Sequence, residues 1–197
     1  MRTPLLVIWL LLPLAAWTYH EGPGQQQMKL DAVDTELAGA AGAVADEDWA
    51  AAIDAYEAAL KALPEDRVTA GRRIRLALNQ ARMMHKQLPT ARSELHQLVR
   101  EMASDAGADP ALLDEARQAE ASAQYYMTWL MRLEGYAREE WEPEIEAARQ
   151  TYRLLAERAA ARGDDAAAQE RREDLESAVK LARLDLEVLQ GLPLPSQ

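Results

Sequence analysis

The chain has 197 residues, a net charge of −11 and no cysteine. The absence of cysteine excludes disulfide scaffolds, iron–sulfur clusters and c-type haem sites. The excess of carboxylates disfavours nucleic-acid binding, because that binding depends on Lys and Arg side chains that neutralise phosphates.

An apolar block from Pro4 to Trp17 follows Arg2 and precedes a polar, helix-breaking stretch at 21–27. Residues 1–20 are therefore predicted to be a signal peptide or an N-terminal membrane anchor. Cleavage after Ala16 would lack the small residue expected three positions before the cut, so we favour a retained anchor at 4–19 over a cleaved signal and a soluble periplasmic protein. Arg2 on the cytoplasmic side predicts that the rest of the chain lies on the periplasmic side of a bacterial envelope.

A linker is predicted at 21–30, an all-helical domain at 31–191 and a short tail at 192–197. Pro and Gly punctuate the domain where helices begin or end, as at Asp109-Pro110, Glu142-Pro143 and Gly163. No segment alternates with the period of two expected for strands. Helices are expected at about 31–45, 47–63, 66–86, 89–104, 110–135, 143–161 and 164–190.

Apolar residues recur along these helices at steps of three and four, which predicts helices packed along their length. The clearest such seam runs along 110–135. Short connections make successive helices antiparallel. The residues of this seam are Leu112, Ala116, Ala119, Ala123, Tyr126, Leu130 and Leu133.

Residues 47–64 combine aromatic and small side chains at spacings that resemble the second helix of a tetratricopeptide repeat. The resemblance is clear over these residues and faint elsewhere. The residues that carry it are Trp49, Ala52, Ile53, Tyr56, Ala59, Leu60 and Pro64. The last three predicted helices are too long for ordinary repeats, so we expect an all-α fold of antiparallel helical hairpins in which a repeat-like N-terminal part merges into a longer helical bundle. The resemblance also implies a concave surface that binds extended peptides.

A polar stripe is predicted on one face of the helix at 66–86. Its members are Arg72, Arg75, Asn79, Arg82 and Lys86, and the interval 67–86 has six basic and no acidic residues. With Leu76 and Met83 at its border, the stripe suits a partner protein that carries an acidic segment or a C-terminal carboxylate. The alternatives are a solvated face or an internal bridge to the glutamates at 139–146.

Five of the eleven Trp and Tyr residues fall between 125 and 141. Tyr125 and Trp129 lie one turn apart, and the sequence leaves two interpretations of them. They are core residues, which we favour, or a candidate aromatic surface that covers a partner or lines a pocket.

The sequence contains no catalytic, metal-binding or cofactor-binding motif. His85 and His96 lack zinc-site spacing, and no Ser lies in a nucleophile-elbow pattern. The glutamates at 139–146 are expected to stabilise a helix N-terminus by their charge. We therefore expect no enzyme and no cofactor, but an envelope adaptor or scaffold for protein–protein interaction. The alternatives are a structural subunit of a membrane complex, a helical ligand-binding domain and an enzyme.

Overall fold

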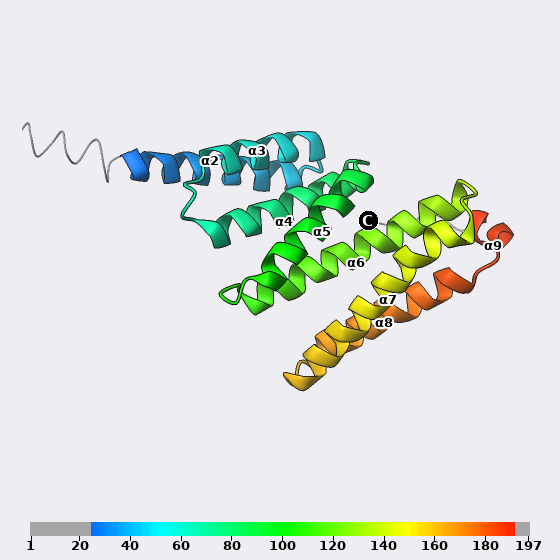
Figure 1. Ribbon diagram of the computed structural model, residues 1–197. Helices are drawn as coiled ribbons and strands as arrows, with labels where there is room; N and C mark the ends of the chain where they lie inside the picture. Colours follow the sequence, from blue (N-terminus) through cyan, green and yellow to red (C-terminus); the bar gives the residue numbers. More distant parts are fainter. Residues whose placement is uncertain (1–24, 192–197) are drawn as a thin grey trace, which may run out of the picture. The chain divides into compact units, whose positions relative to one another are not determined.

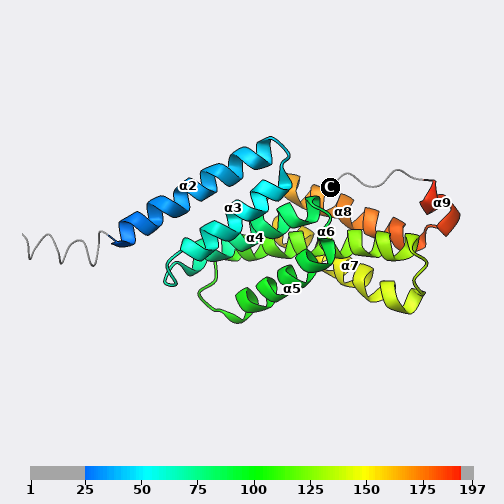
Figure 2. The same ribbon diagram turned by 90° about the horizontal axis from the view of Figure 1, so that it is seen from above.

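The computed structural model describes residues 25–191, and these residues form helices with no strand, as predicted. Consecutive helices pack as antiparallel neighbours (Figures 1 and 2). The apolar block at 4–17 and the tail from 192 lie outside the described residues. The helices are α2 (Gln25–Ala45), α3 (Trp49–Ala62), α4 (Val68–Met84), α5 (Leu88–Ser104), α6 (Pro110–Leu133), α7 (Arg138–Ala161), α8 (Asp165–Arg183) and α9 (Leu186–Gln190).

The chain divides into two compact units, and the boundary between Ile74 and Arg75 falls inside α4. In the first unit, α2 and α3 form a helical hairpin. α2 begins at Gln25, six residues before the predicted start. Asp48 caps α3, since its Oδ1 accepts a hydrogen bond from the Ala51 N–H at 3.1 Å.

Small side chains bring the helices of the first unit together. Ala52 and Ala59 are completely buried in α3. Ala59 clusters with Val33 of α2 and Ile74 of α4, and Tyr56 and Leu60 pack against this cluster. Trp49, by contrast, is only partly buried.

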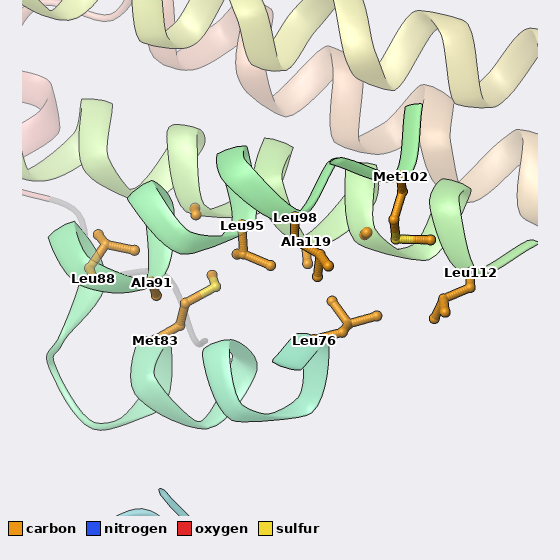
Figure 3. Packing of buried hydrophobic residues seen from close by; sticks show 11 residues of the cluster. Leu76, Met83, Leu88, Ala91, Leu95, Leu98, Met102, Leu112 and Ala119 are labelled. Atoms are coloured by element: carbon orange, nitrogen blue, oxygen red, sulfur yellow. The ribbon is translucent and has the colours of Figure 1, made fainter. Parts of the chain in front are cut away.

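The second unit begins with a continuous apolar core formed by α4, α5 and α6 (Figure 3). α5 contributes residues at steps of three and four, so a single face of α5 is buried along its whole length. The alanines of α6 in this core allow close approach of its backbone to α5. The buried members are Leu76, Met83, Leu88, Ala91, Leu95, Leu98, Met102, Leu112, Ala116, Ala119 and Ala123.

The predicted seam of α6 does not continue to the end of the helix. Leu130 is 36% exposed, whereas Trp129 and Arg132 are buried. α5 has 17 residues and α6 has 24, so the last turns of α6 extend past the antiparallel α5. From Ala121 onward, α6 also packs through a different face into a second cluster with α7, α8 and α9, which includes Ala121, Trp129, Trp141, Ile145 and Leu181.

α7 starts at Arg138, five residues before the predicted start at Pro143. The Glu140 carboxylate accepts a hydrogen bond from the Ala137 N–H at 2.9 Å, which satisfies a backbone donor at the helix start. Burial of Trp141 in the second cluster also favours the additional turn. Pro143 lies in the second turn, where its missing N–H removes a single helical hydrogen bond.

The predicted helix at 164–190 is interrupted between α8 and α9. Leu184 has extended backbone angles, φ −61° and ψ 141°. Arg132 of α6 is 8% exposed, and its guanidinium donates to the carbonyls of Leu181 and Leu184. Its guanidinium carbon also lies 4.8 Å from the ring centroid of Trp141. Burial lowers the pKa of Arg132, while the negative charge of Asp185 opposes this effect.

We expect Arg132→Met to reduce the free energy of unfolding by about 1.5–3 kcal/mol. The substitution keeps the apolar stem but removes the donors that satisfy two carbonyls at the end of α8. Denaturant titration measures the loss. Arg138→Met is the matched control, because Arg138 lies over the same indole at 6.0 Å but is exposed. An Arg132→Met variant as stable as this control would contradict the assigned role.

Candidate functional site

The five residues of the polar stripe do not form one exposed surface. Arg72, Arg75 and Arg82 are partly buried on α4, and Asn79 is 1% exposed. Lys86 lies beyond the end of α4, with a positive φ of 63°. The boundary between the two units separates Arg72 from the other four residues.

Three members of the stripe, Arg75, Asn79 and Arg82, make contacts within the second unit. Arg75 Nη1 lies 2.5 Å from Glu101 Oε2 on α5. Asn79 donates from Nδ2 to the Arg75 carbonyl at 2.8 Å, and its Oδ1 accepts a hydrogen bond from Arg82 at 3.2 Å. Leu76 and Met83, expected at the border of the stripe, are buried in the core instead. Arg75 therefore joins α4 to α5, and the hydrogen bonds of Asn79 lie within α4.

Three of the glutamates at 139–146 pair with arginines other than Arg75. Glu144 accepts hydrogen bonds from Arg92 of α5, with Nε 3.1 Å from Oε2. Glu142 pairs with Arg138 at 2.5 Å, and Glu146 pairs with Arg149 at 2.6 Å. The cluster thus stabilises α7 and joins it to α5.

The two candidate aromatic residues occupy different environments. Trp129 is 6% exposed and belongs to the second apolar cluster. Tyr125 packs against the edge of that cluster and lines a hollow at the surface. Their ring centroids are 6.2 Å apart.

A hollow of about 560 Å³ lies between α6, α7 and α8. Its lining mixes carboxylates and guanidinium groups with the apolar side chains of Leu155 and Ala159. Asp114 is an anionic centre beside it, with Arg158 at 2.6 Å, Arg162 at 3.0 Å and Arg117 at 3.4 Å. The polar lining residues are Asp109, Asp114, Glu115, Gln118, Arg162 and Arg171.

A second hollow of about 200 Å³ adjoins the first between the same three helices. Gln118, which lines the first hollow, donates a hydrogen bond at 3.1 Å to Asp174, which lines the second. We call the second hollow the tyrosine pocket and the two together the α6–α7–α8 groove. The tyrosine pocket is lined by Ser122, Tyr125, Tyr126, Tyr152, Asp174 and Ser177.

The aromatic rings of the tyrosine pocket come from α6 and α7. Tyr125 and Tyr126 meet edge to face, with centroids 5.5 Å apart. Tyr152 is 4% exposed, and its hydroxyl lies 3.4 Å from Ser122 Oγ. Burial raises the pKa of all three phenols, and the charge of Asp174 raises each further.

The contributions of Tyr152, Asp174 and Arg132 could not be predicted from the sequence. Tyr152 belongs to an apolar seam, so its spacing predicts core and not a pocket wall. Asp174 and Arg132 look like ordinary solvated charges, because the contacts that join them to other helices are made with residues more than forty positions away in the sequence. No local pattern identifies such residues.

Histidine and carboxylate side chains also form a pair outside the groove. His96 Nδ1 lies 2.7 Å from Glu120 Oε1, and Glu120 is 8% exposed. Among residues 25–191, no group of three His, Asp or Glu side chains is placed to hold a metal ion. No helix within this range has both the length and the apolarity needed to span a bilayer.

The chain matches no protein-family model, no curated protein and no solved structure.

We expect Arg75→Glu and Glu101→Arg each to destabilise the protein, and the double charge swap to recover part of the loss. Both side chains remain partly exposed, so screening limits the coupling energy to about 0.5–1 kcal/mol. A double-mutant cycle from denaturant titrations measures it, and high salt is expected to weaken it. If the stability loss in the double variant equals the sum of the losses in the two single variants, the ion pair contributes no stability.

Proposed function

We propose that this protein is an adaptor or scaffold on the outer side of a bacterial inner membrane, and that it binds a partner protein in the α6–α7–α8 groove. The observation that carries the proposal is the pair of adjoining hollows on one set of three packed helices. Together they offer apolar, charged and tyrosine side chains along several helical turns. Tyr and Arg are the residue types that protein interfaces favour.

The charges of the groove support binding more than catalysis. Asp114 is paired with three arginines, and Asp174 accepts hydrogen bonds from Arg171 at 2.8 Å and from Gln118. A proton-transfer catalyst needs an acid or base held near its reacting atom with a suitable pKa. Carboxylates already paired with guanidinium groups are better suited to exchanging partners on association.

The repeat-like spacing at 47–64 also supports an adaptor, because the family it resembles binds peptides on helical surfaces. The acidic or C-terminal carboxylate partner predicted for the α4 stripe remains a prediction. The residues of the stripe do not form one exposed surface, which makes the groove the stronger candidate.

We expect Ala167→Phe to reduce partner capture and Ala166→Phe to leave it unchanged. Ala167 lines the larger hollow, while its neighbour Ala166 is exposed and does not. A phenyl ring at 167 occupies the hollow without removing any contact of a large side chain. Photo-crosslinking from Glu115, followed by mass spectrometry of the adducts, identifies the partner and measures the loss.

Melting temperatures of the two alanine variants serve as the control for folding. If Ala167→Phe keeps the wild-type melting temperature and its full yield of crosslinked partner, the groove is not the binding site. If Glu115 yields no protein adduct in cells, the adaptor proposal itself fails.

We expect a C-terminal reporter enzyme that works only outside the cytoplasm to be active when fused to this chain. The basis is the apolar block at 4–17 behind Arg2. Mass spectrometry of the membrane fraction should find an uncleaved N-terminus. A mature N-terminus near Trp17 would show that the segment is a cleaved signal peptide and not a retained anchor. Reporter activity in the cytoplasm would contradict export.

A further inference from the structure

We propose that the tyrosine pocket binds an alkylammonium group, supplied by a lysine side chain of the partner protein. This inference rests on the proposed function and names the chemistry of one contact in the groove. The pocket holds about 200 Å³, which is smaller than the sites that enclose whole small-molecule ligands. Its size suits the end of one side chain.

The lining of the pocket combines three tyrosines with one carboxylate. Tyr125 and Tyr126 contribute two rings that are nearly perpendicular, at 79°, and Tyr152 contributes a third from α7. The negative faces of aromatic rings attract cations, and most strongly where water is partly excluded. Asp174 on α8 supplies a carboxylate beside the rings, and Arg171 pairs with it at 2.8 Å.

The charges around the pocket favour a cation over an anion. Burial raises the pKa of Tyr125, Tyr126 and Tyr152, and the negative charge of Asp174 raises each further. Arg171 acts in the opposite direction on Tyr152, and its effect there is smaller than that of Asp174. These directions agree with the placement of a carboxylate in the wall of the pocket.

The hydrogen bonds of Asp174 favour an ammonium over a guanidinium group. Its Oδ2 accepts from both Arg171 and Gln118, which leaves Oδ1 for an incoming donor. A guanidinium binds best as a fork across both oxygens of a carboxylate, whereas a lysine ammonium is a compact point charge on a flexible stem. The single available oxygen of Asp174 and the small tyrosine-lined pocket therefore suit the ammonium group of a lysine side chain.

The test uses the full chain in a maltoside detergent, with ring-labelled tyrosines observed by NMR. The probe is Nα-acetyl-lysine N-methylamide, and the matched controls are the norleucine and arginine analogues. Replacement of single tyrosines by Phe assigns the signals. We expect the lysine probe to shift the signals of Tyr125, Tyr126 and Tyr152 saturably, and the norleucine analogue to leave them unchanged.

Two variants locate the binding. Ser177 is exposed at the pocket wall, so Ser177→Leu fills the pocket without removing a packed side chain. It should abolish the saturable shift, while Ser177→Ala retains it. Asp174→Asn should weaken binding of the lysine probe by about threefold or more. Unchanged melting temperatures of the Ser177 variants exclude a folding defect.

The inference is overturned if the norleucine analogue shifts the same signals as strongly, or if Ser177→Leu still binds the lysine probe. A saturable shift by free choline with none by the lysine probe would also overturn it, since the ligand would then be a small free amine. If only the proposed function is wrong, the result is different. The tyrosine pocket then still binds the lysine probe, but crosslinking from Glu115 yields no partner protein.

Discussion

Burial of α6 on two separate faces is the constraint on which the second unit depends. One face packs through small residues such as Ala116 and Ala123 against α5, and another packs through Ala121 and Trp129 against α7 and α8. A helix packed on two sides needs small side chains where backbones approach and large ones where gaps remain. α7 and α8 contact this second face from Asp114 near the start of α6 to Trp129 near its end, and the terminal turns of α6 extend beyond α5.

The buried guanidinium of Arg132 follows from this arrangement. At the end of α6 it reaches the terminal carbonyls of α8, which carry the negative end of that helix. These acceptors and the face of Trp141 compensate a cation that has little contact with solvent. Leu184, whose carbonyl accepts one of these hydrogen bonds, is also the residue at which the helix breaks before α9. The side chain of Arg132 therefore contacts α8 at the point where that helix ends.

The α6–α7–α8 groove has a similar origin. α7 packs against both α6 and α8, so its side chains can line hollows together with those of its two neighbours. Polar residues on the facing edges of α6 and α8 then meet over α7, as Gln118 and Asp174 do. Most charges of the groove are paired with each other, which keeps the free protein stable and leaves ion pairs that a partner can exchange.

The sequence by itself determined the helical class, most helix positions and the buried face of α6 as far as Ala123, because these depend on local periodicity and on Pro and Gly signals. It also identified Asp109 as the cap of α6. Only the tertiary structure decided that α7 starts early at Arg138, that Leu130 is exposed and that the last long helix breaks at Leu184. It also decided that Tyr152 and Asp174 line one pocket. These features depend on the relative lengths of neighbouring helices and on contacts between residues distant in sequence, which local spacing does not encode.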